Sequence, residues 1–205
     1  MKDVVIKKCM NLIKKYHDYD DIKLAEIEYG LYGIYLTFSK FIIITTISIL
    51  LGIFKEYILF LLLYNILRTF SFGIHATKSW ICLVSSTIIF IGLPIFCKYI
   101  EINFIIKIIL GSLGTIFMLK NSPADTKKRP IVNKKRRLIL KSISTILAII
   151  YTIISIIIKD NYISNSLLIC LLLQNILIAP LTYRMFKQPY NNYKEFLLNH
   201  PDFIS

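Results

Sequence analysis

Long apolar runs with very few charges limit what this chain can fold into more than any other feature. Five such runs cover residues 35–54, 80–97, 102–119, 138–158 and 163–181. A helix needs roughly 20 mostly apolar residues to cross a hydrocarbon core of about 30 Å. Backbone polar groups inside a bilayer must be satisfied within the segment, which a helix achieves. We therefore predict an all-α integral membrane protein.

A sixth apolar run, residues 57–70, is shorter than the others. Its 14 residues reach only about 21 Å at the rise of an α-helix. The run must therefore extend through Ser71 and Phe72, lie beside thinned lipid, or re-enter the membrane from one side. We count it as a span, which gives about six transmembrane helices.

The distribution of basic residues supports that number. The formal net charge is +13, with 25 Lys and Arg against 12 Asp and Glu. With six spans and the N-terminus inside, 20 basic residues fall in inner loops and tails. Only three, Lys55, Lys98 and Lys159, fall in outer ones. Omitting the sixth span would place the basic cluster after residue 126 outside, so the positive-inside rule favours six spans with both termini cytoplasmic.

The chain reads as one membrane domain over residues 1–205. Residues 1–34 form an amphipathic segment, 35–183 a six-span bundle with a basic cytoplasmic loop at 120–137, and 184–205 a cytoplasmic tail. In the first segment apolar residues recur at helical spacing between lysines. Such a helix either lies on the anionic lipids of the inner leaflet or caps the cytoplasmic helix ends. Long uncharged apolar runs have no role in a nucleic-acid binder, so no nucleic-acid partner is expected.

One loop carries a candidate reactive pair, His75 and Cys82, downstream of Arg68 and Gly73. A cysteine becomes a nucleophile at neutral pH when a base or cation favours its thiolate. Seven residues are two helical turns, which separates the two backbones by about 10 Å, too far for a hydrogen bond. His75 would therefore have to precede the helix and fold back, and Gly73 could supply that turn. The alternatives are an inert buried thiol, a solvated imidazole, and an Arg68 that only marks a span end instead of clamping an anion.

These residues carry a resemblance to a known family. Gly73-Ile-His75-Ala, followed by Cys82 after five further residues, and Pro123-Ala-Asp-Thr ending at Pro130 are jointly specific. With the basic amphipathic start and the spans, the chain resembles the accessory gene regulator B (AgrB) family over essentially its whole length. One departure is Phe72, where members often carry a second glycine before the histidine.

The resemblance implies a multi-pass cysteine endopeptidase of the bacterial cell membrane. The sequence shows no metal-ligand cluster or phosphate loop, so no cofactor or metal is expected. Such enzymes act in quorum sensing, remove the C-terminal segment of a small propeptide through a cysteine thioester, and promote a cyclic thiolactone or lactone signal. By position, Cys82 would be the nucleophile and His75 its base, with Arg68 and Gly73 as supporting residues. The predicted topology puts this site at the cytoplasmic side, where a propeptide would arrive.

Two further features keep alternatives open. Asp125 could orient His75 or serve as a loop turn residue. The basic cluster could bind anionic inner-leaflet lipids, an acidic propeptide segment, or both. Its members are Lys127, Lys128, Arg129, Lys134, Lys135, Arg136 and Arg137.

Other functions are also compatible with this composition. A small transporter or peptide-export component could line a path with polar residues inside the spans, of which the sequence offers Asn65, Lys107, Gln174 and Asn175. We expect these residues to be hydrogen-bonding groups of the bundle rather than the lining of a path. A noncatalytic membrane scaffold is a third possibility, and a homodimer is a possible assembly.

Overall fold

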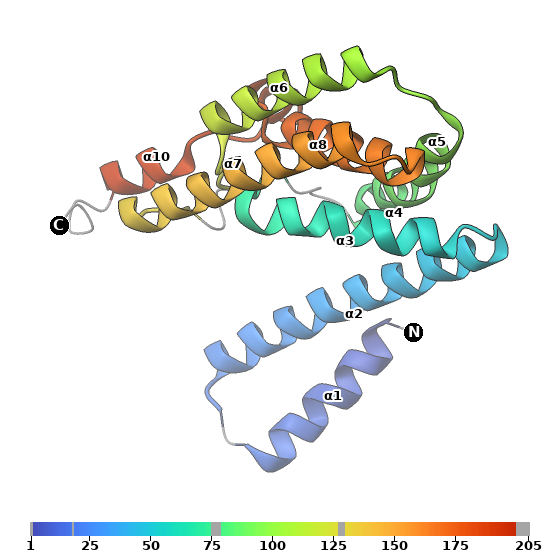
Figure 1. The fold of residues 1–205 in the computed structure, drawn as a ribbon. Coiled ribbons are helices and arrows are strands. Elements are labelled where there is room, and N and C mark those ends of the chain that lie inside the picture. Colours follow the sequence, from blue (N-terminus) through green and yellow to red (C-terminus); the bar gives the residue numbers. More distant parts are fainter. Residues whose placement is uncertain (1, 18, 75–78, 127–129, 200–205) are drawn as a thin grey trace. The chain divides into compact units, whose positions relative to one another are not determined.

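The computed structural model describes residues 2–17, 19–74, 79–126 and 130–199, and these residues are almost entirely helical (Figure 1). The chain divides into two compact units, Met1–Gly52 and Ile53–Ser205. No strand occurs in the described ranges. An isolated β-bridge pairs Phe72 with Ala124. The predicted all-α class is confirmed.

The first unit is a pair of helices, α1 (Lys2–Tyr16) and α2 (Asp21–Leu50). Helix α1 contacts α2, buries Ile6 and Met10, and accepts a hydrogen bond from Tyr32 of α2 at Asp3. Helix α2 begins 14 residues before the apolar run predicted at residue 35. Asp20 caps it by accepting a hydrogen bond from the Lys23 N–H group, so the start is fixed by a cap within the polar segment.

The second unit holds the remaining helices, which follow one another with short connections. They are α3 (Phe54–Ser71), α4 (Ser79–Thr87), the π-helix η1 (Ile88–Gly92), α5 (Leu93–Tyr99), α6 (Phe104–Asn121), α7 (Lys134–Ile157), α8 (Asn161–Ile178), α9 (Pro180–Met185) and α10 (Asn192–Asn199).

Five helical stretches in the described residues are long and apolar enough to cross a membrane: α2, the continuous rod 80–99, α6, α7 and α8. Helix α3 has 18 residues, as many as α6 and α8, because it extends past the predicted run at both ends. It reaches about 27 Å but includes Lys55, Glu56 and Arg68. The count of six spans and the side of each terminus stay predictions.

The rod of α4, η1 and α5 contains a π-helical segment that ends two residues before Pro94. Proline lacks an N–H group, and its ring clashes with the carbonyl group four residues earlier in a regular helix. A local π-turn widens the backbone at that point and lets the rod continue. The rod therefore crosses the proline without a break and carries Cys82 in its first helix.

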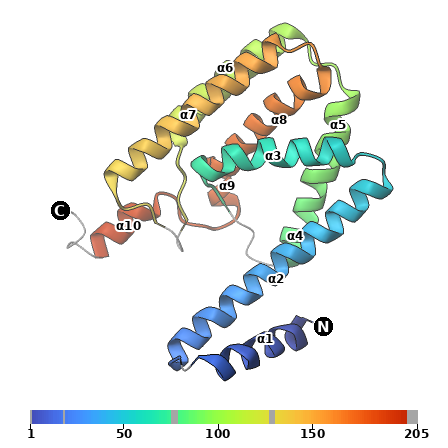
Figure 2. The same cartoon turned by 60° about the horizontal axis from the view of Figure 1, so that its bottom comes forward.

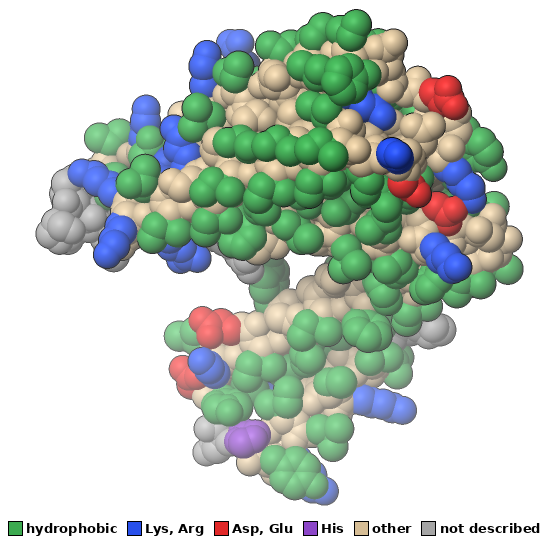
Figure 3. All heavy atoms as spheres, in the orientation of Figure 1, with side chains coloured by type: hydrophobic (Ala, Val, Ile, Leu, Met, Phe, Trp, Pro, Cys, Tyr) green, Lys and Arg blue, Asp and Glu red, His purple; other side chains and the backbone are tan. Residues whose placement is uncertain are grey.

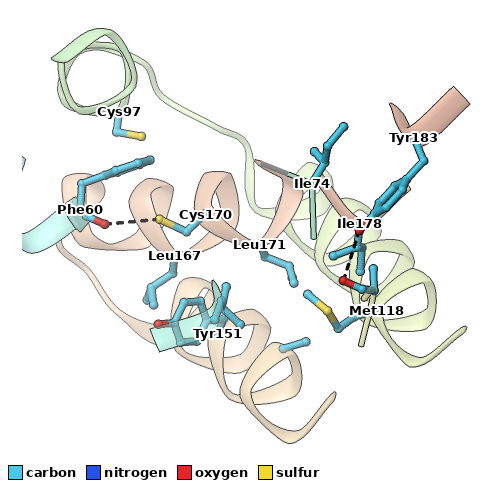
Figure 4. Close-up of a cluster of buried hydrophobic side chains, with 13 residues drawn as sticks. Phe60, Ile74, Cys97, Met118, Tyr151, Leu167, Cys170, Leu171, Ile178 and Tyr183 are labelled. Carbon is cyan, nitrogen blue, oxygen red and sulfur yellow. Dashed lines mark hydrogen bonds between the residues drawn. The ribbon is translucent and has the colours of Figure 1, made fainter. Parts of the chain in front are cut away.

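Helix α8 is the centre of the second unit. It contacts α3, α5, α6 and α7, and Figure 2 shows α6 and α7 side by side with α8 and α3 next to them. Buried apolar side chains from these helices form one cluster, in which Cys170 lies beside Phe60 at one end and Ile178 beside Tyr183 at the other (Figure 4).

On the face of this unit drawn in Figure 3, hydrophobic side chains lie along the helices. On α7 alone, exposed isoleucines recur along the helix at Ile146, Ile149, Ile153 and Ile157. A water-soluble helix would place polar residues there. These faces are suited to lipid, as the membrane assignment requires.

Close helix packing in this unit depends on Gly111. A Cβ atom added there would lie 2.5 Å from Cγ2 of Thr152, whereas Gly33 of α2 has open space around it. We expect Gly111→Ala to lower the free energy of unfolding by on the order of 1–3 kcal/mol because α6 and α7 must move apart. Gly33→Ala, which improves helix propensity without a clash, should leave stability equal or higher. Thermal unfolding in detergent measures both, and equal stability of the two variants would contradict the packing.

Candidate functional site

The chain leaves α3 through a sharp turn at Phe72 and Gly73, directly before the residues predicted to react. Phe72 has φ +59° and Gly73 has φ +111°, both in the left-handed half of backbone space. A Cβ atom at Gly73 would lie 2.8 Å from Arg68 Nη1 and from the Leu177 carbonyl oxygen. Only glycine fits this position without displacing its neighbours.

Backbone hydrogen bonds hold this turn between two other parts of the unit. The Gly73 N–H group donates to the Ala124 carbonyl oxygen (2.9 Å), and Ala124 N–H donates to Ser71 (3.0 Å). The Ile74 N–H group donates to Leu177, near the end of α8 (3.1 Å). We call residues 71–74 the clamped segment. It ends one residue before His75.

Arg68 folds its side chain over the clamped segment from the last turn of α3. Its Nη2 donates to the carbonyl oxygens of Gly73 and Ile74. Its Nη1 is buried and has no hydrogen-bond partner among the residues that the structure describes. A guanidinium with spare donors at this point can receive a carbonyl or carboxylate oxygen.

Gln174 contacts the same segment from α8. Its side chain is fully buried, and Nε2 donates to Ser71 Oγ and to the Phe72 carbonyl oxygen, both at 2.7 Å. The Ser71 hydroxyl in turn donates to Leu67 of α3. The sequence offered only one signal for this contact, a polar residue inside an apolar run.

Cys82 lies in the second turn of α4 and is partly buried, so its thiol is not fully in bulk solvent. Tyr64 lies four residues before Arg68 on α3. Arg68 and Cys82 both lie near enough to interact electrostatically with its hydroxyl. Its ring also packs edge-on against Phe90 of η1, with centroids 5.4 Å apart. The face of α3 that bears Tyr64 and Arg68 is therefore turned toward the rod that carries Cys82.

His75, the predicted base, lies outside the described residues, as do Lys127, Lys128 and Arg129. The other three cysteines lie inside them. Cys97 and Cys170 are buried in the core, Cys9 belongs to α1, and no disulfide joins any of the four. Cys82 stays the predicted nucleophile.

Asp125 has its carboxylate occupied by backbone N–H groups. Oδ1 accepts from Asn192, and Oδ2 accepts from Tyr193 at 2.8 Å and from Ile131 at 3.3 Å. With 1% exposure, it caps the start of α10. Its role in this structure is to hold the loop and the tail together, which sequence spacing did not reveal.

Tyr183 strengthens the same junction. Its hydroxyl donates to the carbonyl oxygens of Ala124 and Asp125, at 3.2 and 3.0 Å. Burial raises the pKa of this hydroxyl above its usual range, so it stays a donor. Residues 124 and 125 therefore join the clamped segment to the C-terminal tail.

The described part of the basic cluster lies at the start of α7. Lys134, Lys135 and Arg136 are exposed, and Figure 3 shows Lys and Arg side chains gathered around this end of α7 and α10. Arg137 instead stacks on the Tyr193 ring, 3.4 Å from its centroid. Cations at a helix N-terminus oppose the helix dipole, so this end attracts an anion.

Polar residues inside the spans mostly tie helices together. Lys107 donates to Ser164 Oγ at 2.7 Å, and Asn175 donates to the Gly114 carbonyl oxygen at 2.9 Å. Asn65 was expected to bond across the bundle, and this is wrong. It donates to Leu61 of its own helix, because it faces outward on α3.

The comparisons with known proteins agree on one family. A family model described as accessory gene regulator B matches residues 6–178. An AgrB-like protein of Listeria monocytogenes is 32% identical over 96% of this chain and 93% of its own length. One of Clostridium acetobutylicum is 28% identical over 90% of this chain and 88% of its own.

The accessory gene regulator protein B of Staphylococcus aureus is 33% identical over 58% of this chain and 64% of its own length. No solved structure matches significantly. The matched range begins in α1 and ends with α8, so it contains the clamped segment, Cys82 and the loop with Asp125. The chain belongs to the accessory gene regulator B family.

Proposed function

We propose that this protein is a membrane cysteine endopeptidase that processes a quorum-sensing propeptide. One observation carries the proposal. The partly buried Cys82 lies on a rod facing Tyr64 and Arg68, while a rigidly clamped segment leads directly to His75. Family membership supports a role in quorum sensing, and the peptidase chemistry is our inference from these residues.

In the proposed reaction, His75 accepts the thiol proton of Cys82, and the thiolate attacks the scissile carbonyl carbon of the propeptide. The tetrahedral intermediate collapses with release of the C-terminal segment as an amine, which takes the proton from His75. The remaining acyl group stays on Cys82 as a thioester. A cysteine thiol or serine hydroxyl within the same peptide then attacks that thioester, closes a ring and frees Cys82.

Ring closure competes with hydrolysis of the thioester by water. Exchange from an enzyme thioester to a product thiolactone is nearly isoenergetic because one thioester replaces another. Water must be kept out for this exchange to win. The partial burial of Cys82 and the apolar surroundings of its helix support such a recessed site.

Arg68 is suited to bind the developing oxyanion or a substrate carboxylate. Its Nη2 is held by the Gly73 and Ile74 carbonyl oxygens, which fixes the plane of the guanidinium. Buried Nη1 retains its hydrogen-bonding capacity toward a ligand. A preorganised cationic donor of this kind stabilises negative charge that forms in the transition state.

An acidic region of the propeptide would dock on the exposed basic residues at the start of α7. Those residues would also contact anionic lipid headgroups of the inner leaflet, in agreement with the proposed site at the cytoplasmic side of the cell membrane. Lipid would hold the enzyme at the surface where its substrate arrives, so the two roles are compatible.

Replacing Cys82 tests the nucleophile. We expect Cys82→Ala to lower cleavage at least ~1,000-fold, because the proposed acyl-enzyme forms on this thiol. The assay co-expresses the enzyme with its candidate propeptide, carrying a C-terminal epitope tag, and follows release of the tag. Cys9→Ala, also a partly buried thiol, is the matched control and should cleave normally. Cleavage by Cys82→Ala would exclude the peptidase, and lost export with intact cleavage would favour a transporter.

Thiol alkylation tests the base without any propeptide. Iodoacetamide should modify Cys82 at neutral pH, and His75→Ala should slow this on the order of tenfold, because an unassisted cysteine is only a few per cent thiolate. Raising the pH should restore the rate. Mass spectrometry of the purified protein in detergent follows each cysteine separately, with His17→Ala as the control. An unchanged rate in His75→Ala would remove His75 from the mechanism.

Asp125→Ala should release the C-terminal tail, because three backbone N–H groups lose their acceptor. We expect trypsin to cut at Lys187 or Lys194 on the order of tenfold faster, reflecting a loss of at least ~1.4 kcal/mol of local stability. Asp20→Ala removes a comparable helix cap in the first unit and should leave the tail protected. Equal tail cleavage in wild type and Asp125→Ala would contradict the anchoring role.

A further inference from the structure

We propose that Gln174 of α8 is a positioning residue for the reaction. It holds the clamped segment and so fixes the backbone from which the proposed base, His75, extends, and it is not itself a catalytic group. This inference rests on the proposed function, in which His75 activates Cys82.

The carboxamide of Gln174 fits two acceptors of the clamped segment at once. Its Nε2 atom carries two hydrogens, and it lies 2.7 Å from Ser71 Oγ and 2.7 Å from the Phe72 carbonyl oxygen. The Ser71 hydroxyl in turn donates to the Leu67 carbonyl oxygen of α3. One side chain on α8 thereby fixes both the last residue of α3 and the first residue after it.

The backbone at Phe72 needs support from outside the segment. A phenylalanine with φ +59° occupies a region that non-glycine residues rarely adopt and that costs free energy. Its carbonyl group has left the helix, so no helical N–H group can satisfy it. Without Gln174, the carbonyl oxygen would lose a short hydrogen bond in a largely buried setting and the strained turn could relax.

Helix α8 is a suitable reference for such positioning. It is packed on α3, α5, α6 and α7, and it contacts the clamped segment twice, through Gln174 and through the Leu177 carbonyl oxygen that accepts from Ile74. The two contacts lie one turn apart on the helix. They fix the start and the end of a four-residue segment against a rigid surface.

Asn175, the next residue, shows what a purely structural amide does in the same helix. It is also buried, but it donates to the Gly114 carbonyl oxygen of α6 and does not contact the clamped segment. Its loss should weaken helix packing without changing the relation of His75 to Cys82. Asn175 is therefore the matched control.

The test uses the full-length protein in detergent and measures iodoacetamide alkylation of Cys82 at neutral pH beside thermal stability. Gln174→Met, of similar shape but without the donor, should slow alkylation about tenfold, as far as His75→Ala does. The double variant should be no slower than either single one. Asn175→Leu should lower thermal stability but leave the alkylation rate within twofold of wild type.

Propeptide cleavage gives a second readout. We expect Gln174→Met to lower kcat about 10- to 100-fold with KM within about twofold, because a misplaced base affects the chemical step rather than binding. If Gln174→Met does not fold, Ser71→Ala decides instead. It removes one of the two acceptors and should slow alkylation in the same direction by a smaller factor.

The outcomes separate the two proposals. If His75→Ala slows alkylation but folded Gln174→Met or Ser71→Ala does not, positioning by Gln174 is wrong and the peptidase proposal stands. If the Gln174→Met effect adds fully to that of His75→Ala, Gln174 acts on stability alone, and positioning is again overturned. If His75→Ala has no effect, His75 is not the base, and positioning by Gln174 is overturned with it.

Discussion

Hydrogen bonds from amide side chains buried on α8 are the interactions on which the second unit depends. Lipid is as apolar as the outer faces of these helices, so the hydrophobic effect does not draw them together in a membrane. Asn165 donates to the carbonyl oxygens of Cys97 and Ile100 at the end of α5, Asn175 to Gly114 of α6, and Gln174 to the end of α3. Each amide ties α8 to a different neighbour, and small residues such as Gly111 let the backbones approach closely enough.

The same hydrogen bonds from α8 help to hold the candidate site rigid. The turn at Phe72 and Gly73 is strained and would not persist alone, but α8, Arg68 and the loop at Ala124 each bind part of it. A cysteine peptidase needs its base at a fixed place, because a small displacement lowers the rate of the chemical step severely. Polar groups that look like packing features along the sequence thus hold the backbone that leads to His75, the proposed base.

Local patterns in the sequence predicted much of this fold, and one helix cap and several contacts between distant residues account for what they missed. The apolar runs predicted every long helix in the second unit, because hydropathy and length are properties of consecutive residues. Helix α2 begins well before its predicted start, since the Asp20 cap continues the helix through a polar stretch. Gly73 was placed at a turn from the sequence. The partners of Asp125 and Gln174 lie 67 and 102 residues away along the chain, and no spacing rule reports such distances.

The loop at residues 124 and 125 connects the basic residues at the start of α7 to the clamped segment. Ala124 accepts from Gly73 in the clamped segment, while Asp125 binds Ile131 just before the basic start of α7 and also the first residues of α10. Arg137 closes the same region by stacking on Tyr193. An anionic ligand at Lys134, Lys135 or Arg136 would therefore act on a surface separated from the clamped segment by one short loop. In the proposed enzyme, the acidic part of a propeptide and its scissile bond would be bound by two surfaces that share this anchor. Substrate docking and the placement of His75 then depend on the same few backbone hydrogen bonds, so loosening the loop would impair both.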